Sequence, residues 1–571
     1  MSLGRTPDHE DAFSSSAGFC RTRLSTSSIY TLLHRESHRL FADETFADLF
    51  GDIGRASVPP RITAVVMVLQ RLEGLSDREA VDRFTFDLRW KYACGGLDYN
   101  HPGFVHTVLV DLRARLRRSD KPNRIFEAVL DVAKSAGLVG RKRVLDSTPL
   151  YDAVATQDTV TLIRSAIRAL LRIVDEALGA QLLACCKRED DYVAPGKPAC
   201  DWDDAPAREA LVDALARDAH AILAALDGRT LCQEVTQAAQ LVATVVGQDL
   251  EQREDGMFRI ARRVAKERVI STVDPEARHG HKTAARGFDG YKGHIAIDPD
   301  SEIITATTVT AGNASDGSVA AALVEDMLGK AVEGSATDVA TDAATDAAAD
   351  VATDAATDAA AASRSDEATP ALAVQGDKPL APVATTPMEI YGDSSYGTAE
   401  FVETIERAGA EANVKVQPPS APEGKFAKDQ FHVDLEDKTV RCPAGVLVVI
   451  RVSTDGSGLA SFGKSCVECA LRSRCTDGKE GRSIRLHPRE ATLQRSRAHQ
   501  RNPQWKARYR ATRPKVERKL AHLMQRRHGG RRARVRGCIR VAQDFALLGA
   551  ANNLKRLAKL GVHYAGASWK C

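Results

Sequence analysis

Two acidic residues, Asp146 and Asp393, each follow a short run of apolar residues. The segments 143–148 and 388–393 are each predicted to contain a short, largely apolar strand that ends in the acid. Carboxylates at the ends of neighbouring strands would lie at one edge of a sheet. Cleavage of a phosphodiester by two metal ions needs carboxylates that hold the two cations about 4 Å apart. Because hard cations prefer oxygen ligands, these acids predict a site for two Mg or Mn ions.

A third carboxylate is needed from a nearby helix, and Glu517 is the candidate. Tyr509, Arg513 and Glu517 are spaced by four residues and share one face if the helix is continuous. Pro514 is tolerated only in the first turn of a helix or at a kink, so we expect a helix to begin near Arg513 or Pro514. From spacing alone, a single Glu among arginines is more often a surface salt bridge.

Basic residues are concentrated in the C-terminal part of the chain. The net charge is only +3, but residues 472–540 contain 23 Lys and Arg against four Asp and Glu. The run is rich in arginine and is interleaved with His499, Trp505 and Tyr509. A short run of this kind would be a solvated face. One of this length favours contact with the phosphate backbone of a nucleic acid.

Other charged residues near the two apolar runs have competing explanations. Five acids lie at turns or in predicted loops, where Asp is favoured for local hydrogen bonding: Asp152, Asp274, Asp298, Asp300 and Asp316. Four basic residues cluster just before or within the second β-rich region: His281, Lys282, Arg286 and Lys292. These four would either line a path for DNA or be ordinary solvated charges.

Four of the twelve cysteines have the spacing C-x23-C-x2-C-x5-C, namely Cys442, Cys466, Cys469 and Cys475. Four thiolates are sufficient for a tetrahedral structural zinc, and the close pair Cys466 and Cys469 is typical of a zinc knuckle. The other spacings are looser than in well-known zinc fingers, and four unrelated buried thiols are the alternative. A bound zinc would stabilise a small insertion without its own core and would not take part in catalysis.

The order of predicted elements indicates how these residues are positioned. A strand ending at Asp146 is followed by a hairpin of 291–298 and 302–310, a helix at 317–328, a strand at 388–393, a helix at 398–408 and a strand at 413–416. This order predicts an α/β fold, with a ribonuclease-H-like mixed sheet flanked by helices. Helical periodicity within 159–268 indicates an insertion into that sheet.

The N-terminal part is predicted to be all-helical. Apolar residues at 60–72 have helical spacing, Gly74 ends that helix, and Ser76 and Glu79 form a capping box for the next one. Such a helix, turn and helix either recognise DNA ends or are simply two packed helices.

The chain is too long for one core, and it divides into seven predicted segments. They are an N-terminal tail (1–40), a helical N-terminal domain (41–140), the first part of the catalytic domain (141–330), a low-complexity insertion (331–385), the second part of the catalytic domain (386–420), a cysteine-containing insertion (421–490) and a basic helical part with the catalytic Glu (491–571).

The low-complexity insertion repeats Ala-Thr-Asp-Ala, which places an acid at every fourth position between 338 and 358. Like charges at that spacing repel along a helix, and there is little apolar surface to bury. We therefore expect a disordered segment without a chemical role.

The chain lacks the sequence features of a membrane or secreted protein. No run of eighteen uncharged apolar residues occurs, and the first twenty residues are polar and acidic. Twelve cysteines without a secretory signal indicate thiols or a metal site rather than a disulfide framework. The expected location is the cytoplasm.

Several ordered motifs resemble insertion-sequence DDE transposases of the IS-four/IS-five superfamily, in the branch with a cysteine-containing insertion before the last acid. The resemblance runs from about residue 41 to 559 and excludes the Asp repeat. Its motifs are DPEAR at 274–278, FDGYK at 288–292, GDSSYG at 392–397, YRATRPKVER at 509–518, HGGRRARVRG at 528–537 and NNLKRL at 552–557.

The resemblance implies that Asp146, Asp393 and Glu517 are the catalytic acids and metal ligands. It also implies that Tyr509 and Arg513 hold DNA phosphate near the scissile bond. Together with the basic run, it predicts the following DNA-binding residues: Lys292, Tyr509, Arg513, Arg526, Arg527, Arg531 and Arg534.

One departure from the family pattern concerns a DNA-end contact. The family usually has Lys seven residues after the Glu, where this chain has Met524. Arg526 or Arg527 lies close enough in sequence to substitute.

The implied activity is cleavage at transposon ends followed by strand transfer, in which the freed 3′-hydroxyl attacks target DNA. The expected partners are the terminal inverted repeats, target DNA and a second copy of the chain, because two ends must be joined. Two alternatives remain: a ribonuclease-H-like nuclease without strand transfer, and an inactive DNA-binding relic.

Overall fold

The computed structural model describes residues 2, 15–152, 156–188, 191, 192, 194, 196–261, 265, 267–283, 286–329, 387–422 and 424–571. The chain divides into two compact units, each described here by itself. The first comprises Met1–Val324 and Thr512–Cys571, and the second comprises Glu325–Ala511. The low-complexity insertion predicted at 331–385 lies outside the described residues.

Short helices form the N-terminal part of the first unit. They are α1 (Ser16–Cys20), α2 (Ile29–Leu40), α3 (Pro60–Glu73), α4 (Asp77–Phe86), α5 (Leu88–Ala93), α6 (Thr107–Arg118) and α7 (Arg124–Ser135), with a 3-10 turn at Asp43–Leu49. Helix α2 differs from the tail predicted over 1–40, because its apolar face, which includes Leu32 and Leu33, is buried. The boundary at residue 41 therefore falls at the end of a packed helix.

Helix α3 is the central helix of this part, since every residue from 62 to 72 is buried. Gly74 ends it in the left-handed conformation, at φ 70°, which favours glycine. Ser76 and Glu79 then form the predicted capping box at the start of α4. The predicted helix, turn and helix are thus present.

Four antiparallel strands follow: β1 (Lys142–Tyr151), β4 (Arg278–Thr283), β5 (Arg286–Ile297) and β6 (Ile304–Ala311). Strand β5 pairs with each of the other three, and β5 and β6 form the predicted hairpin. The prediction that the first strand ends at Asp146 is wrong. Strand β1 pairs with β5 as far as Tyr151, so Asp146 lies in its middle, opposite Ile295.

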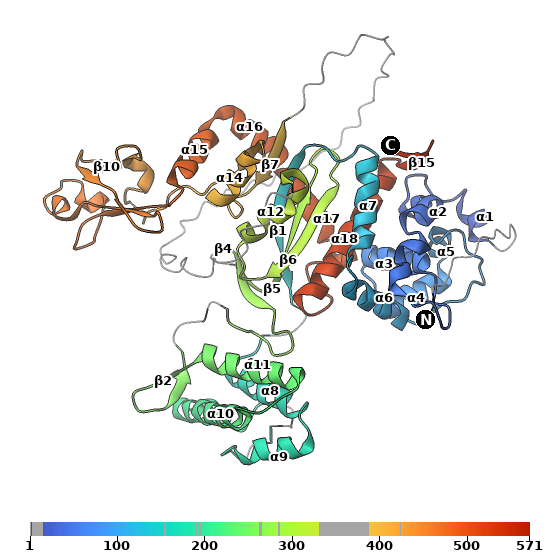
Figure 1. Cartoon of the computed structure of the whole chain (residues 1–571), viewed down its shortest axis with the longest axis horizontal. Coiled ribbons are helices and arrows are strands. Elements are labelled where there is room, and N and C mark those ends of the chain that lie inside the picture. The colour runs from blue at the N-terminus through green and yellow to red at the C-terminus, as the bar shows by residue number, and fades with distance from the viewer. Residues whose placement is uncertain are drawn as a thin grey trace, which may run out of the picture. The chain divides into compact units, whose positions relative to one another are not determined.

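The long helix α18 (Cys538–Lys559) packs against β6, α3 and α7, and Figure 1 shows it in red beside α7. Gly293 of β5 allows this contact, because a Cβ there would lie 2.8 Å from the ring of Phe545. Asn553 fixes the register, since its buried amide accepts from the backbone nitrogen of Ile304 and donates to that residue's carbonyl, both at 2.8 Å. The first unit also contains α17 (Pro514–Leu523) and the final hairpin of β15 (His563–Ala565) and β16 (Ser568–Lys570).

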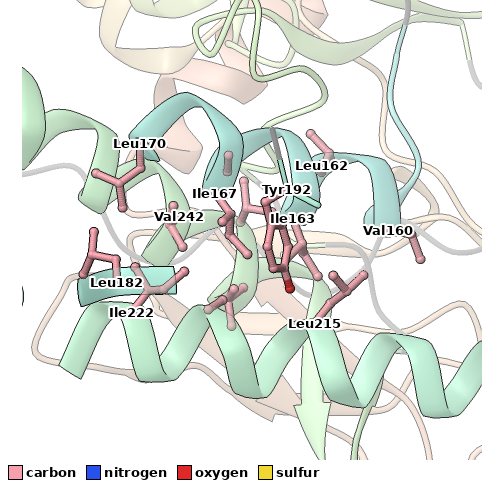
Figure 2. Packing of buried hydrophobic residues seen from close by; sticks show 14 of the residues in the cluster. Val160, Leu162, Ile163, Ile167, Leu170, Leu182, Tyr192, Leu215, Ile222 and Val242 are labelled. Atoms are coloured by element: carbon pink, nitrogen blue, oxygen red, sulfur yellow. The ribbon is translucent and has the colours of Figure 1, made fainter. Parts of the chain in front are cut away.

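The insertion between β1 and β4 is mainly helical. It contains α8 (Thr159–Leu171), α9 (Glu176–Ala184), α10 (Ala205–Leu226), α11 (Gln233–Asp249) and a small hairpin of β2 (Leu250–Gln252) and β3 (Phe258–Ile260). Figure 2 shows its core, in which side chains such as Ile163 and Leu215 from α8 and α10 meet. Tyr192 is also buried there and donates to Asp218 at 2.7 Å. The insertion has a hydrophobic core of its own.

The helix predicted at 317–328 is interrupted. A 3-10 turn at Asp316–Val319 leads into α12 (Ala320–Leu323), and α13 (Glu325–Leu328) belongs to the second unit. Gly317 and Ser318 are weak helix formers at the start of this segment, which agrees with the turn.

The second unit contains the parallel pair β7 (Met388–Gly392) and β8 (Ala410–Val414), joined by α14 (Ala399–Arg407). Two small antiparallel sheets follow, with β9 (His432–Asp434), β10 (Thr439–Arg441) and β11 (Leu447–Val449) in one, and β12 (Arg451–Val452), β13 (Gly458–Ser461) and β14 (Ser483–Leu486) in the other. Helices α15 (Glu490–Arg501) and α16 (Pro503–Thr512) end the unit. Strand β8 begins and ends before the limits of the strand predicted at 413–416.

The chain is of the mixed α/β class, with antiparallel strands in the first unit and a parallel pair in the second. Within the described ranges, no helix has both the length and the apolar character required to cross a membrane.

Candidate active site

Asp146 is held in the middle of β1 by Arg513. Its carboxylate receives two contacts from the guanidinium, at 2.9 Å to Oδ1 and 3.1 Å to Oδ2, and Oδ1 also accepts from the backbone nitrogen of Ser147 at 2.8 Å. The side chains of Asp146 and Arg513 are only 12% and 8% exposed. This is a two-pronged, nearly buried ion pair between residues 367 positions apart in the sequence.

Glu517 lies in the first turn of α17, and its carboxylate is 3.5 Å from the same guanidinium. Its side chain is 62% exposed, so the solvent reaches one side of the pair. Arg513 precedes α17 with helical backbone angles, and Pro514 occupies the first helical position, as the sequence predicts. One cation thus contacts two of the three predicted acids.

Asp393 lies directly after β7 in the second unit, where Oδ1 accepts from the backbone nitrogen of Ser395 at 3.0 Å. Tyr509 of α16 donates to the carbonyl of Gly392 at 3.1 Å, so its phenol lies at the end of the strand that carries Asp393. Trp505 stacks on Tyr509 with ring centroids 4.8 Å apart. The predicted strand with a terminal acid is present here, and Tyr509 belongs to α16 rather than to the helix of Glu517.

The competing acids mainly have structural contacts. Asp298 is buried, and it accepts from the backbone of Ser301 at 2.8 Å and of Gly140 at 2.8 Å, which fixes the turn between β5 and β6. Asp274 is buried and accepts from Tyr291 at 2.7 Å. The carboxylate of Asp300 lies 3.3 Å from Lys515 and is 68% exposed.

Lys292 does not present its ammonium to solvent. It contacts Asp316 at 2.9 Å and the carbonyl of Ala314 at 2.8 Å, and its side chain is only 16% exposed. Ser147 donates to the same Asp316 at 2.6 Å. No local pattern in the sequence indicated this network, because its members belong to three separate segments.

The predicted basic residues of the C-terminal part differ in exposure. Arg526, Arg527 and Arg531 are exposed, whereas Arg534 is partly buried and donates to the carbonyl of Leu75. Met524, which replaces the Lys of the family pattern, ends α17 and is partly buried. Near the β5 hairpin, His281, Lys282 and Arg286 are exposed.

The four cysteines of the second unit line one small cavity of about 20 Å3. Cys466 and Cys475 are buried, Cys442 and Cys469 are partly buried, and all four are free thiols. The backbone nitrogen of Arg482 donates to the sulfur of Cys466 at 3.4 Å. Burial raises the pKa of Cys475, and the neighbouring thiols add to this effect while Arg482 opposes it.

No group of three or more His, Cys, Asp or Glu side chains among the described residues is arranged to hold a metal ion. The donor chemistry can still be compared with the predicted ions. Asp146 and Glu517 supply carboxylate oxygens around one positive charge, which suits a hard divalent cation. The thiols around the small cavity suit zinc.

Comparison with known families identifies three segments of the chain. Residues 30–115 match the family described as transposase domain (DUF772). Residues 257–351 and 441–558 match two families that are each described as transposase DDE domain. No significant match was found among curated proteins or solved structures.

The matched segments cover part of the candidate site. The match at 441–558 contains the four cysteines, Tyr509, Arg513 and Glu517, whereas Asp146 and Asp393 lie outside all three segments. Parts of the chain therefore match transposase DDE domains, and the assignment of individual acids depends on the contacts described above.

Proposed function

We propose that this chain, parts of which match transposase DDE domains, cleaves DNA at the ends of a mobile element and joins those ends to target DNA. Asp146, Asp393 and Glu517 would hold two Mg or Mn ions at a ribonuclease-H-like catalytic domain. The structural observation that carries this proposal is the contact of Arg513 with both Asp146 and Glu517.

That contact supports a cation site because two carboxylates from distant segments are held around one positive charge. Bringing two carboxylates together in a partly buried place is unfavourable unless a cation lies between them. In the protein alone, the guanidinium of Arg513 supplies that charge. When metal is bound, Arg513 would be released from Asp146 to contact a DNA phosphate.

The residues divide the proposed reaction between them. Asp146, Asp393 and Glu517 would bind the two cations, which supply an activated oxygen nucleophile and stabilise the leaving oxygen. Arg513 and Tyr509 would orient the scissile phosphate. The exposed Arg526, Arg527 and Arg531 would hold the flanking backbone, and one of the first two would replace the missing Lys at Met524.

DNA is the proposed partner, in the form of terminal inverted repeats and target. The helical part around α3 and α4 lies within the segment matching a transposase domain, which supports a role in recognising DNA ends. Joining two ends requires two active sites, and we propose a homodimer assembled on DNA.

The test uses the full chain, magnesium and DNA that flanks the chain's own gene. Wild type should cut at the element ends and join them to a labelled target, and D146N, D393N and E517Q should each lower both rates by at least about a thousandfold. D300N is the matched control, because Asp300 is an exposed acid whose contact is with Lys515, and it should retain both rates. Cutting without joining would indicate a nuclease, and binding without either reaction would indicate an inactive relic.

A structural zinc on the four cysteines is a separate proposal. Their common cavity and the bond from Arg482 to Cys466 support it. Elemental analysis of purified chain should find one zinc per chain, lost in C466S and C469S, together with lower thermal stability. C538S is the control because Cys538 lies outside that cavity. If the purified wild-type chain contains no zinc, and C466S and C469S are as stable as wild type, the proposal is contradicted.

A further inference from the structure

A cavity of about 590 Å3 lies within the first unit, between the N-terminal helices and the segment 529–547. We call it the arginine cavity, because six arginines line it against only three acids. The arginines are Arg71, Arg113, Arg117, Arg532, Arg534 and Arg540, and the acids are Asp77, Glu79 and Asp544. Such an excess of positive charge in a concave site favours an anion.

Two of the arginines maintain the fold. Arg71 is buried, contacts Asp544 at 3.0 Å and donates to the carbonyl of His528. Arg113 donates a hydrogen bond to the carboxylate of Asp77. These pairs account for two of the three acids, and they connect or brace the walls of the cavity.

Three other arginines form no close ion pair in the described part of the chain, although Asp544 and Asp77 act on the charge of Arg534 from a longer distance. Among the described side chains, no acid lies within ion-pair distance of Arg117, Arg534 or Arg540. Arg117 donates to the amide oxygen of Gln543 at 3.1 Å, and Arg534 donates to the carbonyl of Leu75. Burial lowers the pKa of Arg117, and the nearby charge of Arg540 lowers it further. An anion between them would relieve both effects.

The walls of the arginine cavity are firmly connected. Gln543 of α18 donates to the carbonyl of Arg113 at 3.5 Å and of Pro122 at 3.4 Å. The turn after α3 packs so closely that a Cβ at Gly74 would lie 2.7 Å from the carbonyl oxygen of Arg527. The site is therefore preformed, which lowers the entropic cost of binding.

The remaining lining is mixed: it has apolar side chains from both walls, for example Leu116 of α6, Phe126 of α7 and Leu547 of α18, and four polar ones, Gln70, Ser76, Asn123 and Gln543. A volume of 590 Å3 is more than a phosphate ion needs and is within the range of about 300–1,000 Å3 typical of sites for small organic ligands. Apolar side chains beside a cationic part match a nucleotide, because its phosphate is anionic and the flat face of its base packs against apolar side chains.

We propose that the arginine cavity binds one nucleotide of a DNA strand, with its phosphate between Arg117, Arg534 and Arg540. Guanidinium groups suit this phosphate because they donate several hydrogen bonds in a fixed plane. The choice of DNA over a free nucleotide rests on the proposed function. Binding in the cavity itself does not depend on catalysis, so it can be tested separately.

The test measures the affinity of the full chain for a fluorescent oligothymidylate of six nucleotides. Binding is followed by fluorescence polarisation in the absence of divalent metal. R117Q and R540Q should each weaken binding at least tenfold, as expected for loss of a charge-assisted contact. R536Q is the matched control, because Arg536 is exposed in the same basic segment but does not line the cavity, and it should change affinity less than threefold.

Stability separates this role from a structural one. Because Arg540 is exposed and repels Arg117, R540Q should melt at or above the temperature of wild type while binding DNA more weakly. Hydrogen exchange should show that the oligothymidylate protects residues 107–118 and 529–541. Equal effects of R117Q, R540Q and R536Q, or no protection there, would overturn the proposal.

Binding of thymidine 5′-monophosphate tests whether the site takes a nucleotide within a DNA strand or a free nucleotide. The strand should bind at least tenfold more tightly than the monophosphate, and tighter binding of the monophosphate would overturn the assignment to DNA. Cleavage is measured separately from binding. If wild type binds the oligothymidylate but cuts no DNA, and R540Q binds it more weakly, the proposed function is refuted while the binding site in the cavity stands.

Discussion

Replacing Arg513 by Gln should destabilise the first unit, because the nearly buried carboxylate of Asp146 then loses its cation. The side chain of Asp146 is 12% exposed, and both of its oxygens contact the guanidinium. Breaking one partner of a buried ion pair costs about 3–5 kcal/mol. We take about 3 kcal/mol, the lower limit, because Glu517 leaves one side of the pair open to solvent.

The pair can be isolated by a double-mutant cycle of R513Q and D146N. R513Q alone leaves a buried charge, whereas the double variant leaves two neutral amides, so the double variant should be more stable than R513Q. The coupling free energy should be about 2–3 kcal/mol, within the range measured for contacting charged residues.

Hydrogen exchange of the peptide that covers β1 is the assay, because it reports the opening of the strand that carries Asp146. A loss of about 3 kcal/mol corresponds to roughly a hundredfold faster exchange of its slowest amides. Adding Mg should restore part of the protection in R513Q and none in the double variant. Additive effects of the two single substitutions would refute the ion pair.

Three further outcomes follow from individual contacts. Replacing Asn553 by Ala leaves the buried backbone groups of Ile304 without partners and should lower stability by about 2–4 kcal/mol, measured by urea unfolding. Gly74→Ala requires a Cβ at φ 70° and 2.7 Å from a carbonyl oxygen, so we expect a loss of more than about 1 kcal/mol and a lower melting temperature. Burial lowers the pKa of His528 to about 4, so the fold disfavours the protonated form of this side chain. The stability that depends on neutral His528 is therefore fully present above pH 6.5 and is lost as the pH falls towards 4. The free energy of unfolding at pH 5 should be about 2 kcal/mol lower than at pH 7. H528Q should weaken this dependence of stability on pH. If the stability of H528Q falls as steeply below pH 7 as that of wild type, the explanation is wrong.

Local patterns in the sequence predicted much of the secondary structure. The capping box at Ser76 and Glu79, the hairpin of β5 and β6 and the helix beginning at Pro514 depend on short-range chemistry, and the structure confirms them. The extension of β1 beyond Asp146 was missed because burial on both faces removes the alternation that marks a strand.

Contacts between distant segments could not be predicted in this way. The two contacts that Asn553 makes with Ile304, and the network of Lys292, Ser147 and Asp316, join segments that no local pattern connects. The four-residue spacing of Arg513 and Glu517 indicated a shared face, but nothing in the sequence indicated that Arg513 also holds Asp146.

The central claim is that Asp146, Asp393 and Glu517 bind the same pair of cations, and iron can report it directly. Fe2+ bound in place of Mg2+ generates hydroxyl radicals that cut the polypeptide only within a few ångströms of the metal. With ascorbate and peroxide, the wild-type chain should be cut near residues 146, 393 and 517 together, and excess Mg2+ should suppress all three cuts. Cuts near 146 and 517 without one near 393 would show that Asp393 does not share the site and would contradict the account.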